Sequence, residues 1–84
     1  MIVFKEILEY LDNEQTIDVT CGVDENNSIK TPKTVFYGKA IDAYANRKSL
    51  EGFWVRKVLD INAYVDTLKG ESVPVVMITL RSYD

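Results

Sequence analysis

The sequence predicts an α+β domain, with an N-terminal helix packed on a mostly antiparallel four-stranded sheet, a short second helix and a C-terminal β-hairpin. Hydrophobic residues first recur at helical spacing and then, from Gln15 onward, at the alternating spacing typical of strands. Two strand-like segments close together at the C-terminal end are typical of a hairpin. With 84 residues, the chain has room for one domain, which we place over residues 1–84.

The N-terminal helix is predicted over residues 3–12. One apolar face has the spacing i, i+3, i+4, i+7, and its members are Phe4, Ile7, Leu8 and Leu11. Asp12 and Asn13 follow, and their side chains compete with helical backbone hydrogen bonds. We therefore expect the helix to end there and to cover one face of the sheet.

A strand with one polar face is predicted over residues 15–21. Its apolar positions alternate with polar ones and are Ile17, Val19 and Cys21. We expect Gly22 to end this strand. Residues 22–33 are polar and contain many turn-forming residues, which predicts a long loop.

The middle of the chain predicts a second strand over 34–39 and a short helix over 43–51. Gly38 within the strand indicates a bulge or a close approach of another group to the backbone. Asp42 is a residue type that caps helices, and Gly52 stands where a left-handed residue commonly ends one.

The C-terminal part predicts strands over 55–65 and 73–80, joined by a hairpin turn within 67–72. The second of these strands is apolar on both faces, as expected of a central strand with Ile78 fully buried. Proline cannot donate to a ladder of hydrogen bonds, so we expect Pro74 at the start of this strand.

Composition argues against catalysis and against metal or cofactor chemistry. The chain has no histidine, which is the usual general base and the commonest metal ligand. Its one cysteine, Cys21, can form no disulfide within the chain and falls on the apolar phase of its strand, which predicts a core residue. No apolar run approaches the roughly 20 residues of a membrane span. We expect a cytoplasmic protein that is not an enzyme.

One segment partly matches a calcium-binding loop. Asp24, Asn26 and Ser28 stand at its first, third and fifth ligand positions. The loop also needs glycine at position 6 and glutamate at position 12, where this chain has Ile29 and Val35. We therefore interpret the segment as a solvated turn.

Several segments together resemble small uncharacterised proteins encoded in phages and mobile elements of Gram-positive bacteria. The segments are Phe4–Asp12, Thr16–Thr20, Phe36–Lys39, Val58–Ile61 and Val76–Leu80. The resemblance implies an accessory protein that acts on a host or phage factor. It implies no catalytic residue and no cofactor.

Charge is divided unevenly along the chain. Residues 30–57 carry seven basic and two acidic residues, whereas residues 1–29 carry one basic and seven acidic residues. Aromatic residues interleave with the basic ones, a combination found in single-strand nucleic-acid binders and at protein interfaces. The isoelectric point of about 4.8 argues against a nucleic-acid-binding protein, because such domains are usually basic.

We therefore predict a non-catalytic accessory protein that acts through protein–protein interaction, including pairing with a second copy as a homodimer. The expected contact residues are Trp54, Phe53, Tyr44, Arg47, Lys48, Arg56 and Lys57. Nucleic-acid binding through residues 33–57 is the alternative. A third interpretation has Trp54 fully buried as a core residue with the bases dispersed over the surface. We expect no membrane and no small-molecule cofactor as partner.

Overall fold

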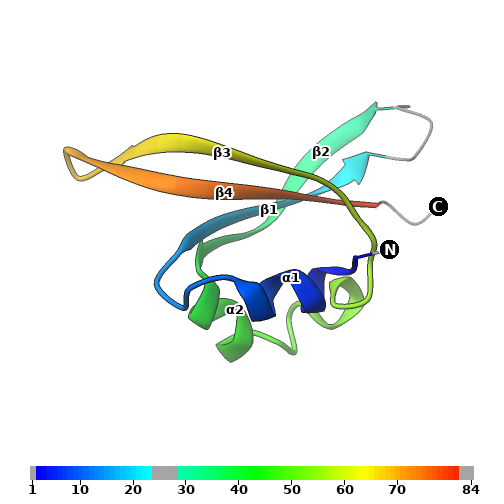
Figure 1. The fold of residues 1–84 in the computed structure, drawn as a ribbon. Helices are drawn as coiled ribbons and strands as arrows, with labels where there is room; N and C mark the ends of the chain where they lie inside the picture. The colour runs from blue at the N-terminus through cyan, green and yellow to red at the C-terminus, as the bar shows by residue number, and fades with distance from the viewer. Residues whose placement is uncertain (1, 24–28, 82–84) are drawn as a thin grey trace.

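The computed structural model describes residues 2–23 and 29–81 and has the predicted α+β fold (Figure 1). Its elements, in chain order, are α1 (Phe4–Tyr10), β1 (Thr16–Val23), β2 (Ile29–Lys39), α2 (Ala40–Ala45), the 3₁₀ turn η1 (Glu51–Phe53), β3 (Val58–Leu68) and β4 (Glu71–Arg81). No helix in these two ranges is long and apolar enough to cross a membrane.

The sheet consists of two antiparallel hairpins placed side by side, in the order β2-β1-β4-β3. The hairpins meet through β1 and β4, which run parallel. The sheet is thus mostly antiparallel, as predicted, and the apolar strand β4 is central. Ile78 in β4 has no exposed surface, which confirms its predicted burial.

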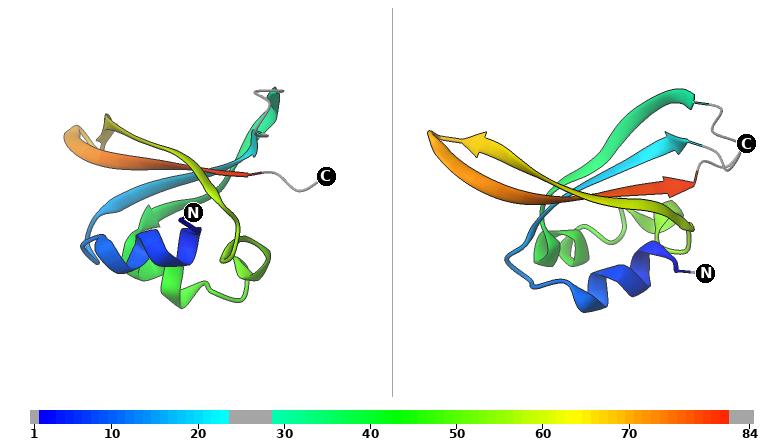
Figure 2. Two further views of the ribbon diagram at one scale, coloured as in Figure 1. Left: turned by 45° about the vertical axis from the view of Figure 1, so that its right-hand side comes forward. Right: turned by 45° about the horizontal axis from the view of Figure 1, so that its top comes forward.

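Both helices pack against the same face of the sheet, and the opposite face is left open (Figures 1 and 2). The predicted apolar face of α1 explains this layer, because Phe4 and Leu8 are buried against the sheet. The rest of the core comes mainly from the sheet and α2, and comprises Ile17, Val19, Cys21, Ala40, Ala43, Leu50, Ile78 and Leu80.

The predicted loop over 22–33 is wrong at both ends, because β1 continues to Val23 and β2 begins at Ile29. Gly22 does not end β1. Its φ of 129° is a backbone conformation that glycine adopts readily and other residues rarely do. The register of β1 with both β2 and β4 shifts at this point, as in a β-bulge. β2 is an edge strand, where polar residues and Pro32 are tolerated, so its composition resembles a loop. Residues 24–28 lie outside the described ranges.

The second helix also differs from the prediction, because α2 spans Ala40–Ala45 rather than 43–51 and Asp42 lies in its first turn. The first amides of α2 are satisfied by backbone: Ala40 N donates to Gln15 O at 2.9 Å and Ile41 N to Asn13 O at 3.0 Å. A side-chain cap is therefore unnecessary. Residues 46–50 form turns, and the predicted stop residue Gly52 lies within η1.

The C-terminal hairpin is confirmed, with shifted boundaries. β3 begins and ends three residues later than predicted, and β4 starts at Glu71. Lys69 and Gly70 form the turn with φ values of 53° and 80°, the two positive values that suit the twist of a two-residue hairpin. Pro74 is the fourth residue of β4, and the ladder with β1 begins only at the next residue. The missing proline N–H therefore falls where β1 offers no partner.

Candidate functional site

Trp54 is held in a half-buried position by contacts from three parts of the chain. Its ring stacks with Phe4 at a centroid distance of 5.3 Å and with Tyr44 at 6.1 Å. Its indole Nε1 donates a 3.0 Å hydrogen bond to the carbonyl oxygen of Arg47. Trp54 is thus neither fully buried nor a freely rotating surface anchor.

The segment around Trp54 also caps the N-terminus of α1. Lys5 N donates to Trp54 O at 2.9 Å, and Phe4 N donates to Arg56 O at 3.0 Å. These bonds satisfy amides that have no partner within the helix. The cap brings the start of α1 and the residues after η1 together, although about fifty residues separate them in the sequence.

A shallow cleft of about 360 Å³ lies beside the indole and is lined by Lys5, Tyr44, Arg47, Trp54 and Val55. Its apolar surface is accessible, since Val55 is 66% exposed and Tyr44 is 39% exposed. Lys5 and Arg47 place cations at its margin, and both residues are exposed. We call these five residues the Trp54 cleft.

Three of the seven predicted contact residues meet in the Trp54 cleft, namely Tyr44, Arg47 and Trp54. Phe53 and Arg56 contact each other instead, with the guanidinium carbon 4.6 Å from the ring centroid. Arg56 also donates from Nη1 to Cys21 Sγ at 2.9 Å and from Nε to Gly52 O at 3.1 Å. Through these contacts Phe53 and Arg56 stabilise the folded chain, and neither side chain lines the Trp54 cleft.

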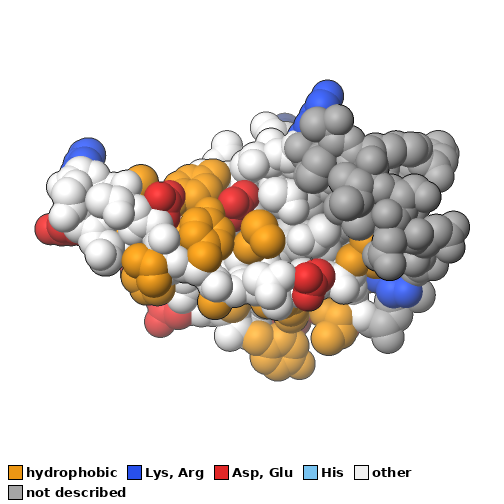
Figure 3. Space-filling view, turned by 90° about the horizontal axis from the view of Figure 1, so that it is seen from above, with side chains coloured by type: hydrophobic (Ala, Val, Ile, Leu, Met, Phe, Trp, Pro, Cys, Tyr) orange, Lys and Arg blue, Asp and Glu red, His pale blue; other side chains and the backbone are white. Residues whose placement is uncertain are grey.

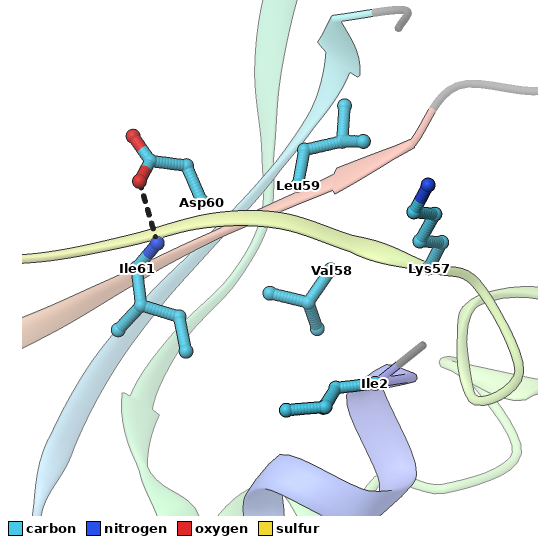
Figure 4. Close-up of a pocket in the computed structure, with 6 residues that line it drawn as sticks. All are labelled: Ile2, Lys57, Val58, Leu59, Asp60 and Ile61. Atoms are coloured by element: carbon cyan, nitrogen blue, oxygen red, sulfur yellow. Dashed lines mark hydrogen bonds between the residues drawn. The ribbon is translucent and has the colours of Figure 1, made fainter.

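The other two predicted residues lie apart from the cleft. Lys48 is exposed in the turn that follows α2. Lys57 lines a separate depression at the start of β3, together with Ile2, Val58, Leu59, Asp60 and Ile61 (Figure 4). Sequence reasoning missed Lys5 and Val55, because the contact that assembles the cleft is the tertiary cap on α1.

Sequence reasoning also missed a network on the open face of the sheet. Tyr37 Oη donates to Asp66 Oδ2 at 2.6 Å, and Tyr64 Oη donates to Asp18 Oδ2 at 2.8 Å. The hydrogen bond to Asp66 raises the pKa of Tyr37 to about 12, and the bond to Asp18 raises the pKa of Tyr64 to about 12. Val75 is on the same face and is only 1% exposed.

Acidic and hydrophobic side chains lie next to one another on this face (Figure 3). Asp18 Oδ1 is buried and has no hydrogen-bond partner among the described residues, whereas its Oδ2 is the acceptor for Tyr64. Tyr64 reaches Asp18 across β4, and Tyr37 reaches Asp66 across both β1 and β4. Alternation within each strand does not predict these contacts, because they depend on the order of the strands in the sheet.

The structure places Cys21 in the core, as predicted, with 8% of its surface exposed. In the described ranges, no three histidine, cysteine, aspartate or glutamate side chains are grouped so that they could hold a metal ion. The partial calcium-loop pattern at Asp24, Asn26 and Ser28 lies outside those ranges.

No protein-family model, curated protein or solved structure matches this chain. The resemblance to phage and mobile-element proteins therefore stays a prediction.

Proposed function

We propose that the chain is a non-catalytic binding module that holds an acidic protein segment in the Trp54 cleft. The observation that carries the proposal is the stacked pair of exposed Tyr44 and half-buried Trp54, flanked by Lys5 and Arg47. An apolar side chain of the partner would rest against the two rings and Val55. Carboxylates beside it would pair with the two cations.

The composition and rigidity of the cleft support a protein partner. Trp, Tyr and Arg are the residue types that contribute most strongly to binding at protein interfaces. Trp54 is already fixed by two ring contacts and one hydrogen bond, so little side-chain entropy would be lost on binding. The cations favour acidic partners and speed their association.

Nucleic-acid binding is the alternative, and the exposed ring of Tyr44 beside Arg47 is the feature that favours it. The Trp54 ring is less suited to stack on a base, because it already stacks with Phe4 and Tyr44. The acids of the open sheet face would also repel phosphates that came near them. A protein partner therefore accounts for more of the geometry.

A biological setting follows from the sequence resemblance. We propose an accessory role in a phage or mobile element, in which the cleft engages a host or phage protein. Pairing of two copies as a homodimer remains a further proposal, which sedimentation of the purified chain would test.

A displayed peptide library, selected on the purified chain, would test the cleft directly. We expect enriched peptides to carry an apolar residue flanked by aspartate or glutamate. A double variant, Tyr44→Ala with Arg47→Glu, should lose these peptides. The bond from Trp54 Nε1 goes to the backbone of Arg47, so this variant leaves it in place.

A matched control changes an aromatic and a cation elsewhere, as Tyr10→Ala with Lys69→Glu. Both residues are exposed and neither lines the cleft. This control should retain the selected peptides. Peptides that lack acids, or that still bind the Tyr44 and Arg47 variant, would contradict the proposal. Tight binding of a fluorescent single-stranded oligonucleotide, lost steeply with salt and with Arg47→Glu, would favour the alternative.

A further inference from the structure

The two edges of the sheet differ in how they resist pairing with another strand. β2 contains Pro32 and three lysines, which are residue types that protect an edge. β3 is equally long, with 11 residues, but contains no proline, lysine or arginine. Its only charged residues are Asp60 and Asp66.

The hairpin geometry shows which backbone groups of β3 point outward. A two-residue turn makes Leu68 and Glu71 a hydrogen-bonded pair, because they flank it directly. Hydrogen-bonding direction alternates along a strand, so the even-numbered residues of 60–68 bond to β4. The outward-facing residues are Ile61, Ala63, Val65 and Thr67.

Two of these outward amides are capped by aspartates. Asp60 Oδ1 accepts a 2.9 Å hydrogen bond from Ile61 N, and Asp66 Oδ1 accepts a 2.8 Å bond from Thr67 N. Ala63 and Val65 lie between the capped positions. The two carboxylates thus occupy edge donors that an added strand would use.

The start of the same edge already pairs with an extended stretch of backbone at Ile2 and Val3. Val3 forms an antiparallel bridge with Lys57, and Val58 N donates to Ile2 O at 2.8 Å. Lys57 O accepts from Arg81 N of β4, so the bonds to the N-terminal residues lie on the outer side. Beyond this bridge the edge continues along β3 toward the hairpin turn, which projects past the helices (Figure 1).

Side chains on the two faces of β3 differ in chemistry. The open face carries Asp60, Asn62, Tyr64 and Asp66. The opposite face carries Ile61, Ala63 and Val65, of which Ile61 is 45% exposed and Val65 is 68% exposed. Val58 and Ile61 point toward Ile2, and the three side chains form one side of an apolar depression (Figure 4).

We propose that an extended protein segment with alternating basic and apolar residues binds at this edge, as a fifth strand beside β3. Its backbone carbonyl oxygens would accept hydrogen bonds from the amides of Ile61 and Thr67. Asp60 and Asp66, released from those amides, would then pair with the basic side chains on the open face. The apolar side chains would lie beside Ile61 and Val65, next to the depression at Ile2.

Charge complementarity favours such a segment over a second copy of β3. A second β3 in antiparallel pairing would bring its own two aspartates to the same face. Four carboxylates would then share two adjacent strands, and like charges that face each other across strands are destabilising. A strand with basic side chains would instead form ion pairs with Asp60 and Asp66. The edge would therefore select a basic segment over a second copy of β3.

Titration of the whole chain with a capped, fluorescent peptide of alternating lysine and valine tests the proposal. We expect saturable binding, together with slowed hydrogen exchange at the amides of Ala63 and Val65. A peptide with glutamate in place of lysine should bind at least about tenfold more weakly. A lysine–valine peptide that is N-methylated on alternate residues cannot complete the ladder and should also bind at least about tenfold more weakly.

Two substitutions at one position separate backbone pairing from general charge attraction. Ala63→Pro removes an outward donor and leaves the bonds to β4 in place, whereas Ala63→Val keeps the donor. We expect Ala63→Pro to weaken binding about tenfold and Ala63→Val to leave it nearly unchanged, with thermal unfolding showing that both variants fold. Equal binding of both variants, or of the N-methylated and unmodified peptides, would overturn the proposal.

Asp60→Asn with Asp66→Asn keeps an amide oxygen beside each edge amide but removes both charges. We expect this variant to bind the lysine–valine peptide at least about tenfold more weakly. Stronger dimerisation of the same variant in sedimentation would support the role of the aspartates in excluding a second copy. Undiminished peptide binding by the variant would contradict the assigned pairing.

Discussion

Tyr64 Oη donates a 2.8 Å hydrogen bond to Asp18 Oδ2, across the width of the intervening strand β4. The two residues are 46 positions apart in the sequence and belong to different hairpins. Tyr37 and Asp66 form a second bond that also links the two hairpins. These two bonds supplement the parallel ladder of β1 and β4, which joins the hairpins in the middle of the sheet.

The tyrosine–aspartate bonds predict a loss of stability in alkali. Each bond requires a protonated phenol, and the pKa of Tyr37 and of Tyr64 is raised to about 12 by it. An unfolded tyrosine has a pKa of about 10. The contribution is therefore fully present below about pH 10 and is lost as the pH rises to about 12. We expect the urea midpoint of the wild type to fall across this range.

A double variant, Tyr37→Phe with Tyr64→Phe, should be less stable at neutral pH and show a smaller alkaline loss. Tyr10→Phe is the control for tyrosine ionisation in general, because Tyr10 is 85% exposed. It should follow the wild type at every pH. An alkaline loss of the same size in the double variant would show that other groups cause it.

Ile78 and Ile61 pair across β3 and β4 but differ sharply in burial. Ile78 has no exposed surface, so Ile78→Ala should lower the free energy of unfolding by about 2–5 kcal/mol. Ile61 is 45% exposed, and Ile61→Ala should cost less than about 1 kcal/mol. Denaturant unfolding measures both values. Similar losses for the two variants would be incompatible with a central β4 and an edge β3.

The sequence predicted the elements whose pattern reflects burial directly. The helical spacing of Phe4 and Leu8 and the two-sided apolar character of β4 follow from their contacts with the core. The predicted ends of helices and strands were wrong where tertiary contacts, rather than local sequence, determine where an element begins. Backbone carbonyls of Gln15 and Asn13 start α2 without a side-chain cap, and an edge strand with Pro32 resembles a loop.

The candidate site was partly predictable for the same reason. Tyr44, Arg47 and Trp54 lie within eleven consecutive residues, so the interleaving of aromatic and basic residues in this segment placed them among the seven predicted contact residues. Lys5 joins them only because Trp54 O accepts its backbone amide, a contact with no sequence signature. The tyrosine–aspartate network likewise depends on strand order, which alternation does not specify.

Gly22 should tolerate substitution poorly, because its φ of 129° is rarely adopted by L residues. Gly22→Ala should lower the free energy of unfolding by about 1–3 kcal/mol. Gly52→Ala is the matched control, since a Cβ at Gly52 would meet no atom within 4 Å. That control should be neutral or slightly stabilising. Calorimetric unfolding of both variants gives the comparison, and an unchanged Gly22→Ala protein would contradict the bulge.

Trp54 and Tyr44 stack on each other but should respond differently to truncation. Trp54 packs against the core and on Phe4, so Trp54→Ala should lower the free energy of unfolding by at least about 2 kcal/mol. Tyr44 is 39% exposed, and Tyr44→Ala should cost less than about 1 kcal/mol. Both should weaken binding of acidic peptides to the cleft, because both rings line it. Denaturant unfolding and peptide titration, made on the same variants below their unfolding transitions, separate the two effects. A Tyr44→Ala protein that keeps full affinity for those peptides would place the binding surface elsewhere, whatever the stability of the Trp54 variant.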